Sequence, residues 1–265
     1  DRVADRTDLP ASGIHKSFGA LAVLNGIDFA LHSDEAVGII GPNGAGKSTL
    51  LAVLSGATPP TQGRVILNGT DVSALPARDR AARGLVRTHQ IPKPFSGITV
   101  FENVLVAATH AGAARHTDAY DLALDALQVC GMMNVANRPA ESVGLLDRKR
   151  LELARALATR PRLLLLDEIG GGLTDAEASE LVDTIRSLRA RRIGIVWIEH
   201  IVRILVQVAE RLVCMDAGKI IAQGTPNVVM ADPDVVSAYL GGVPACPFCP
   251  SRTLTCDTAS SAPCA

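Results

Sequence analysis

The sequence predicts an α/β fold with a mostly parallel core sheet, a flanking antiparallel β subdomain and an inserted α-helical subdomain. Short continuous apolar runs, as at residues 163–166 and 193–198, are typical of parallel strands that are buried on both faces. Alternating or β-branched runs within residues 14–40 and 64–71 indicate antiparallel strands. After residue 90 the spacing of apolar residues becomes helical, which predicts the inserted subdomain.

The composition supports a large core of aliphatic side chains. Hydrophobic residues make up 48% of the 265 residues and aromatic residues only 3%, which suits helices packed on parallel strands. The formal net charge of −1 lacks the basic surplus of nucleic-acid-binding proteins, so we expect no nucleic-acid partner. The apolar runs fall far short of the roughly 20 residues of a membrane-spanning helix. With neither Met nor an apolar signal at its start, the chain is expected to be cytosolic.

The N-terminal strands are expected to turn at two Asn-Gly pairs, Asn25-Gly26 and Asn68-Gly69, because such pairs favour hairpin turns. Helical spacing predicts helices at residues 99–109 and 118–130. The apolar face of the second helix would be formed by Tyr120, Leu124 and Leu127.

Helices and strands alternate in the second half of the chain. A helix is expected at residues 147–159, before a proline, and the helix after residue 173 would be capped by Thr174 or Asp175. Its inward stripe would be formed by Leu181, Ile185 and Leu188. A closing hairpin is expected at residues 213–222 and a last helix at residues 232–240.

Between a predicted strand at residues 36–40 and a predicted helix from residue 49, one segment fits the pattern G-x-x-x-x-G-K-[ST] at every fixed position. The segment consists of Gly41, Pro42, Asn43, Gly44, Ala45, Gly46, Lys47, Ser48 and Thr49. In such a loop, backbone N–H groups point into one concavity at the positive end of the following helix. Lys47 would reach the β- and γ-phosphates of ATP, and the Ser48 hydroxyl would bind Mg²⁺. We therefore favour a P-loop NTPase over a Gly-rich surface turn.

Two adjacent carboxylates follow a buried strand, at the edge of the sheet where such folds place ligands. Neighbouring residues of a strand point to opposite sides, so Asp167 and Glu168 are expected to have different roles. Asp167 would hold Mg²⁺, through water, and Glu168 would act as the general base. The alternative is an acidic pair that caps the next turn.

Three further residues are candidates with open alternatives. His200 follows the next strand and could bind a γ-phosphate, although a single histidine is equally consistent with a surface role. Gln90 could contact Mg²⁺ or the attacking water, or could belong to a plain linker. Phe18 could stack on an adenine ring, although core packing is the commoner role of phenylalanine.

Together these residues resemble the ATP-binding-cassette (ABC) ATPases, and the match runs in order from Leu9 to Gly242. The resemblance places Phe18 at the adenine-stacking position, Gln90 at the Q-loop and His200 at the switch histidine. The segments at residues 86–90, 99–104 and 232–241 are similar to the ATPases of branched-chain amino acid transporters.

The resemblance implies an ATPase with ATP and Mg²⁺ as cofactors. Two such subunits would close head to tail on two ATP molecules and drive a membrane permease, which a separate substrate-binding protein supplies with branched-chain or related amino acids or amides. The subunit would lie peripherally on the cytoplasmic face of the inner or plasma membrane. A cassette used away from membranes and a nucleotide-gated module with weak hydrolysis are the alternatives.

The signature segment departs from the family pattern Leu-Ser-Gly-Gly-Gln. Residues 143–147 read Val-Gly-Leu-Leu-Asp, so the Ser hydroxyl and the second Gly are lost. In the family these groups contact ATP on the opposite subunit, so the resemblance predicts a heterodimer with two unequal sites. Ile169 and Thr174 are milder departures.

The cassette is expected to span residues 9–242, with a helical subdomain at about residues 92–160. Residues 243–265, rich in Cys, Pro and Ser, are expected to be a disordered tail rather than a zinc site, because the cysteine spacing is irregular.

Overall fold

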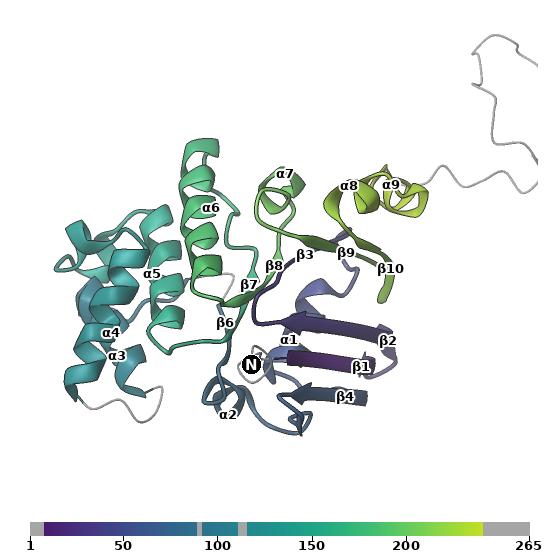
Figure 1. Ribbon diagram of the computed structural model, residues 1–265, viewed down its shortest axis with the longest axis horizontal. Helices are drawn as coiled ribbons and strands as arrows, with labels where there is room; N and C mark the ends of the chain where they lie inside the picture. The colour runs from purple at the N-terminus through teal and green to yellow at the C-terminus, as the bar shows by residue number, and fades with distance from the viewer. Residues whose placement is uncertain (1–7, 89–91, 111–115, 241–265) are drawn as a thin grey trace, which may run out of the picture.

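The computed structural model describes residues 8–88, 92–110 and 116–240 of the chain. Its core is a six-stranded sheet in the order β10-β9-β3-β8-β7-β6 (Figure 1). These strands are β3 (Ala36–Ile40), β6 (Leu85–Arg87), β7 (Leu163–Asp167), β8 (Gly194–Ile198), β9 (Arg211–Asp216) and β10 (Lys219–Gly224). Within this sheet every pairing is parallel except that of β10 with β9. The mostly parallel core sheet that the sequence predicts is confirmed.

Helices and a second sheet cover the two faces of this core. Successive side chains of a strand point to opposite faces, so neighbouring residues of β7 belong to two separate apolar clusters. Leu164 and Leu166 pack with buried residues of α5 (Leu145–Leu157) and α6 (Asp175–Ala190). Leu163 and Leu165 pack with those of α1 (Lys47–Ser55). This double cover explains why β3, β7 and β8 are buried at every residue.

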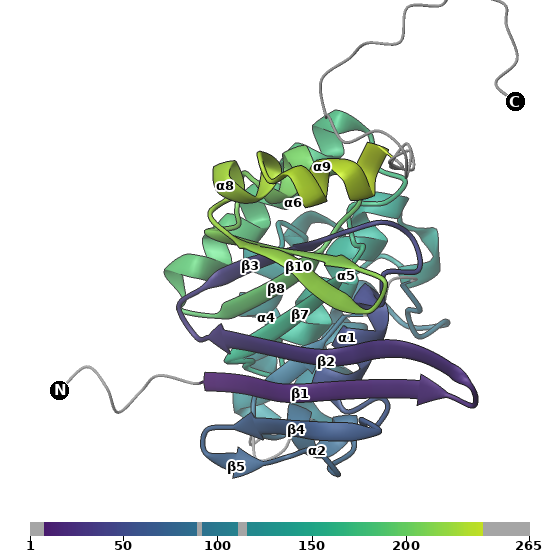
Figure 2. The ribbon, with the colours of Figure 1, turned by 90° about the vertical axis from the view of Figure 1, so that its right-hand side faces the viewer.

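The flanking antiparallel sheet has the order β2-β1-β4-β5, and Figure 2 shows its strands one below another. Its strands are β1 (Asp8–Phe18), β2 (Leu21–His32), β4 (Gln62–Leu67) and β5 (Thr70–Asp71). The predicted turn at Asn68-Gly69 is confirmed, because these two residues join β4 to β5 with φ angles of 51° and 76°.

The predicted turn at Asn25-Gly26 is wrong. Both residues lie inside β2, at an irregularity in its pairing with β1. The Asn25 N–H group donates to the Gly218 carbonyl oxygen at 2.8 Å, and its side-chain amide donates to Ala217 O at 3.3 Å. The pair therefore forms part of a bulge that contacts the β9–β10 turn. The β1–β2 turn is made by residues 19–20.

The region predicted as the helical subdomain contains α3 (Val100–His110), α4 (His116–Val129) and α5. The predicted apolar face of α4 is wrong in part, because Tyr120 and Leu124 are exposed and only Leu127 is buried. The buried face also carries three small side chains: Ala119, Ala123 and Ala126. Small residues let α4 approach its neighbours closely, so its inward face could not be identified from its largest side chains.

The remaining elements follow the predicted order, but among the described residues strand β6, three short α-helices and the 3₁₀ helices Met133–Val135 and Ala140–Ser142 were not predicted. Thr174 rather than Asp175 caps α6, in a reciprocal capping box with Glu177. The predicted inward residues of α6 are all buried. The last predicted helix is α9 (Pro233–Leu240), and the unpredicted ones are α2 (Ala77–Ala81), α7 (Val202–Leu205) and α8 (Pro226–Met230). Across the described residues, no helix combines the length and hydrophobicity needed to cross a membrane.

One fully buried cation supports the helix that follows the P-loop. The Arg80 guanidinium donates to Val53 O at 2.8 Å and to Leu54 O at 2.7 Å, which are carbonyls of the last turn of α1. It also donates to Leu75 O and Ser73 O, both at 3.0 Å. Burial lowers the pKa of Arg80 to about 10. The fork of donors therefore adds charged hydrogen bonds at the carboxyl end of α1, where Val53 O also accepts one from the Gly56 N–H group.

Replacing Arg80 by Met is expected to lower the free energy of unfolding by about 3 kcal/mol, because several buried carbonyl groups lose charged donors. Urea unfolding would measure the change. Arg78→Met on the same helix is the control, since that side chain is 91% exposed, and its effect should stay within about 0.5 kcal/mol. Equal losses in the two variants would contradict this role of Arg80.

Candidate nucleotide-binding site

The P-loop joins β3 to α1, in the strand, loop and helix order that the sequence predicts. Two of its glycines are required by close packing at positive φ. Gly41 has a φ of 145°, and a Cβ there would lie 2.1 Å from the Met215 carbonyl oxygen. Gly46 has a φ of 98°, and a Cβ there would lie 2.9 Å from a methyl group of Leu24. The loop can therefore adopt this path only without side chains at these two positions.

Lys47 is a nearly buried cation at the start of α1. Its Nζ donates to Gly41 O at 2.7 Å and to Pro42 O at 2.8 Å. Burial lowers the pKa of Lys47, while the nearby carboxylates of Glu168 and Asp167 act in the opposite direction. Neutral carbonyl groups thus bind an ammonium whose charge is only partly compensated, which is suited to an incoming anion.

A hollow of about 190 Å³ lies beside the loop. Its lining consists of Val23, Asn43, Gly44, Ala45, Gly46, Lys47, Ser48, Thr49 and Glu168. The first turn of α1 contains no acidic residue of its own, so its own sequence places no negative charge at the positive end of the helix. The fold therefore brings most of the predicted P-loop residues and the carboxylate of Glu168 around one cavity.

Asp167 is buried at the end of β7 and contacts two elements. Its Oδ1 accepts a hydrogen bond from Ser48 Oγ at 3.3 Å, and its Oδ2 lies 2.6 Å from Arg87 Nη2. The hydroxyl and carboxylate predicted to share a metal are therefore neighbours. Arg87 was not identified from the sequence, because its contact arises only when β6 pairs with β7.

Glu168 leaves the strand, which corrects the expectation that it and Asp167 point to opposite sides. Its φ is 48°, outside the extended region, and its N–H group donates to Ile198 O at 2.9 Å. Its Oε1 lies 2.9 Å from His200 Nε2, and the residue lines the hollow by the P-loop. The left-handed backbone thus turns both carboxylates toward the same site, and His200 joins Glu168 there.

One predicted site residue, Phe18, lies apart from the hollow, and a second, Gln90, is not described by the structure. Phe18 ends β1 with 52% of its surface exposed, beneath the Lys16 ammonium at 4.9 Å from the ring centroid, and it is absent from the lining of the hollow. Gln90 lies outside the described residues. Their roles stay predictions.

Glu199 is a buried acid that was not predicted as a site residue. It accepts hydrogen bonds from the Gly170 N–H group and, at 3.2 Å, from Trp197 Nε1. A Cβ on Gly170 would lie 2.8 Å from the carboxylate, so this approach requires glycine. Burial raises the pKa of Glu199, and the Lys149 ammonium opposes the shift. The position of Glu199 directly after a buried strand could have identified it as a candidate. Glu199 ties the strand before His200 to the loop after Glu168.

The altered signature segment forms the start of α5. Gly144 caps the helix with an extended backbone, and Leu145 follows with 45% of its surface exposed. The Arg-Leu-Glu part of the helix is held by ion pairs of Arg150 with Glu180 and of Arg155 with Glu152. The helix is therefore intact, while its first turn presents aliphatic side chains.

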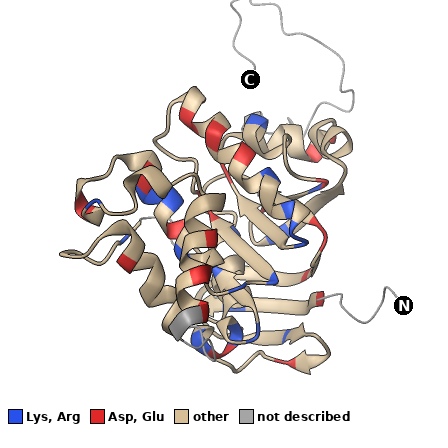
Figure 3. Ribbon diagram, turned by 60° about the vertical axis from the view of Figure 1, so that its left-hand side comes forward, with Lys and Arg blue, Asp and Glu red and all other residues tan. Residues whose placement is uncertain are grey.

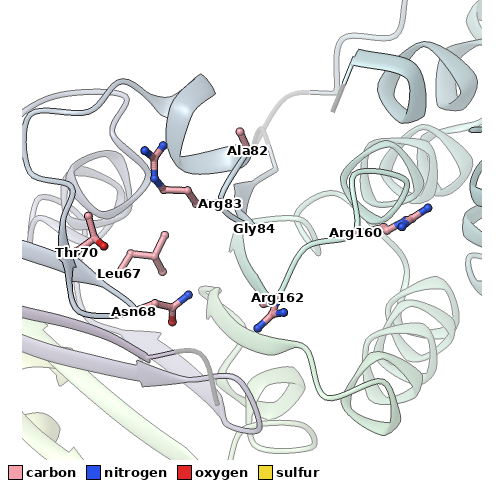
Figure 4. Close-up of a pocket in the computed structure, with 8 residues that line it drawn as sticks. All are labelled: Leu67, Asn68, Thr70, Ala82, Arg83, Gly84, Arg160 and Arg162. Atoms are coloured by element: carbon pink, nitrogen blue, oxygen red, sulfur yellow. The ribbon is translucent and has the colours of Figure 1, made fainter. Parts of the chain in front are cut away.

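A second hollow of about 500 Å³ lies away from the P-loop and contains none of the predicted site residues (Figure 4). It is lined by Leu67, Asn68, Thr70, Ala82, Arg83, Gly84, Arg160 and Arg162. Figure 4 shows its arginine side chains extending in different directions rather than toward one point. Figure 3 likewise shows basic and acidic residues interspersed over the elements facing the viewer. Size alone therefore does not identify the nucleotide site, and the smaller hollow has the suitable chemistry.

The parallel sheet, the glycine-constrained loop and the helix behind it define the P-loop NTPase class. Residues 24–170 match the ABC transporter family, and residues 219–245 match the family described as branched-chain amino acid ATP-binding cassette transporter. The chain belongs to the ABC transporter family, and like the ATP-binding proteins of that family it hydrolyses ATP.

Among its relatives is the high-affinity branched-chain amino acid transport ATP-binding protein BraF of Pseudomonas aeruginosa, 34% identical over 89% of this chain and 98% of BraF. The lipopolysaccharide export system ATP-binding protein LptB of Haemophilus influenzae is also 34% identical, over 88% of this chain and 97% of LptB. The ADP conformation of MJ1267, an ATP-binding cassette of an ABC transporter, aligns with a TM-score of 0.80 at 29% identity, covering 89% of this chain and 99% of that one.

The variant Glu199→Gln is expected to gain stability relative to the native chain as pH rises. The folded chain binds the Glu199 proton more tightly than the unfolded chain, because burial raises its pKa above the ordinary value of 4.5. The native chain therefore loses stability as pH rises from that value through the raised pKa, and the glutamine does not. Urea unfolding at about pH 4 and about pH 8 would measure the difference. Asp121→Asn, at an exposed position of α4, is the control. A pH-independent difference would contradict the assignment.

Proposed function

We propose that Mg-ATP binds in the hollow beside the P-loop. The residues fit both parts of the ligand. The partly compensated charge of Lys47 and the positive end of α1 suit the phosphates. The hydroxyl of Ser48 and the carboxylate of Asp167 are oxygen donors of the kind that Mg²⁺ prefers, with Gln90 as a further candidate. When bound, Mg²⁺ would neutralise charge on the phosphates.

In this proposal the carboxylate of Glu168 accepts a proton from the attacking water. Its position at the rim of the hollow and its contact with His200 support the role, because a general base must be held close to the phosphate. His200 would orient the carboxylate and approach the γ-phosphate. The buried Glu199 would hold the loop that follows Glu168, through its hydrogen bond from the Gly170 N–H group. Phe18 would stack on the adenine ring.

We further propose that the chain drives uptake of branched-chain or related amino acids or amides. The observation that carries this proposal is the match of residues 219–245 to the branched-chain amino acid cassette family. Identity along the whole cassette is equal for BraF and LptB, whose names give different substrates, so the C-terminal match is the more specific indication.

The partners in this proposal are a second cassette, membrane permease subunits and, indirectly, a substrate-binding protein. The helical subdomain would offer a permease its exposed large apolar side chains at Phe95, Leu124 and Met133. Such side chains mark interaction sites when they gather on one part of a protein. The subunit would then lie peripherally on the cytoplasmic face of the membrane.

Replacing Glu168 by Gln is expected to lower ATP turnover by about 10²-fold or more while retaining ATP binding, since a general base contributes about 10²–10⁴-fold. Phosphate release would measure turnover, and light scattering with ATP present would show whether a closed pair accumulates. The Asp121→Asn variant, at an exposed position of α4, should keep native turnover. Unchanged turnover in Glu168→Gln would remove the proposed base.

The altered signature predicts that this chain works with a different cassette whose signature is intact. Residues 143–147 lack the Ser hydroxyl that would contact ATP on the opposite subunit, so a homodimer would have two weak sites and a heterodimer only one. Turnover of the purified chain alone should therefore be about 10-fold or more below that of the chain with its partner cassette, as expected when one oxyanion-type donor is missing. Brisk turnover by the chain alone would exclude an obligate heterodimer.

A further inference from the structure

The C-terminal helix contacts the P-loop directly. The N–H group of Gly41, the first P-loop residue, donates a hydrogen bond of 2.7 Å to the hydroxyl oxygen of Tyr239, which lies in α9, 198 residues further along the chain. Figure 2 shows α9 beside β10. Burial raises the pKa of Tyr239, so the hydroxyl stays neutral and serves as an acceptor for the amide. None of the catalytic assignments above uses this contact.

The segment before α9 holds the other end of the loop. The N–H group of Gly218, in the β9–β10 turn, donates to Ala45 O at 3.1 Å. Met215 of β9 packs so tightly against Gly41 that a Cβ there would meet its carbonyl oxygen at 2.1 Å. Residues from β9 to α9 therefore frame the P-loop at both ends, and Tyr239 is the side chain through which α9 takes part.

Gly41 is the point where the loop can change direction. It has a left-handed φ of 145°, and its carbonyl oxygen accepts a hydrogen bond from Lys47. Rotation of the Gly41 backbone would therefore break the bond to Tyr239 and move the carbonyl group that orients the lysine. A hydroxyl fixed on a helix outside the loop restricts that rotation.

We propose that Tyr239 is a positioning residue that holds the P-loop in its nucleotide-accepting conformation, so that α9 sets the affinity for Mg-ATP. The proposal rests on the proposed nucleotide site. If the hydroxyl is removed and the binding conformation becomes less populated, the apparent affinity for Mg-ATP falls in proportion to the population of that conformation. The groups on β7 and after β8 keep their geometry. The hydroxyl, rather than the ring, is the part of the side chain that matters.

The test is the variant Tyr239→Phe, which keeps the ring and removes the hydroxyl. The chain offers a matched control in its other tyrosine, Tyr120. Its ring centroid lies 5.2 Å from that of Phe101, and replacement by Phe preserves this packing. Loss of one hydrogen bond is expected to speed exchange of the Gly41 amide and to raise the Kd for Mg-ATP by about fivefold, with kcat within about twofold of native. NMR-detected hydrogen exchange, calorimetric titration and steady-state turnover would measure these quantities.

The outcomes separate this inference from the proposed function. Unaltered exchange at Gly41 in the nucleotide-free Tyr239→Phe variant would overturn the positioning role, whether or not the native chain binds Mg-ATP. Faster exchange with an unchanged Kd, or a loss of kcat alone, would also overturn it. Absence of Mg-ATP binding by the native chain would instead remove the proposed function. A weaker Kd in Tyr239→Phe, beside native values in Tyr120→Phe, is the supporting result.

Discussion

The site depends on the confinement of one ammonium group by a loop of backbone. Lys47 is buried against carbonyl oxygens of its own P-loop, so its charge is solvated by dipoles rather than by a carboxylate. This arrangement requires the loop to curl tightly, which Gly41 and Gly46 permit because a Cβ at either position would clash. A loop of this kind holds positive potential in place before any anion arrives, so little reorganisation is needed on binding.

The carboxylates around this cation are kept apart by their own partners. Asp167 is paired with Arg87 and bonded to Ser48, whereas Glu168 turns out of the strand toward His200. Neither forms a direct ion pair with Lys47 in the described structure, although both lie close enough to influence its pKa. Separate partners leave the lysine for phosphate and give two adjacent acids different environments, which is how neighbouring carboxylates acquire different chemistry.

The sequence predicts the parts of this site that are local and not those that depend on register. The P-loop was recognisable because its glycines, Lys47 and Ser48 lie within one short segment between a strand and a helix. Arg87 and Tyr239 reach the site across 80 and 198 residues, so their contacts appear only once the strands are paired and the last helix is placed. The left-handed backbone at Glu168 is likewise stabilised by the hydrogen bond from its N–H group to Ile198 O, which no sequence pattern predicts.

The altered signature segment is physically connected to the hydrolytic loop of the same chain. A Cβ on Gly172 would lie 3.2 Å from a methyl group of Leu145, so the first turn of α5 rests on the loop that follows Glu168. In the head-to-tail pair that we propose, α5 would face the other subunit's nucleotide. Movement of the loop after Glu168 would thus shift Leu145 and change the surface that the first turn of α5 presents to the other subunit. In that pair the aliphatic segment would lack a donor to the opposite ATP but would keep this packing contact, through which one site could influence the other.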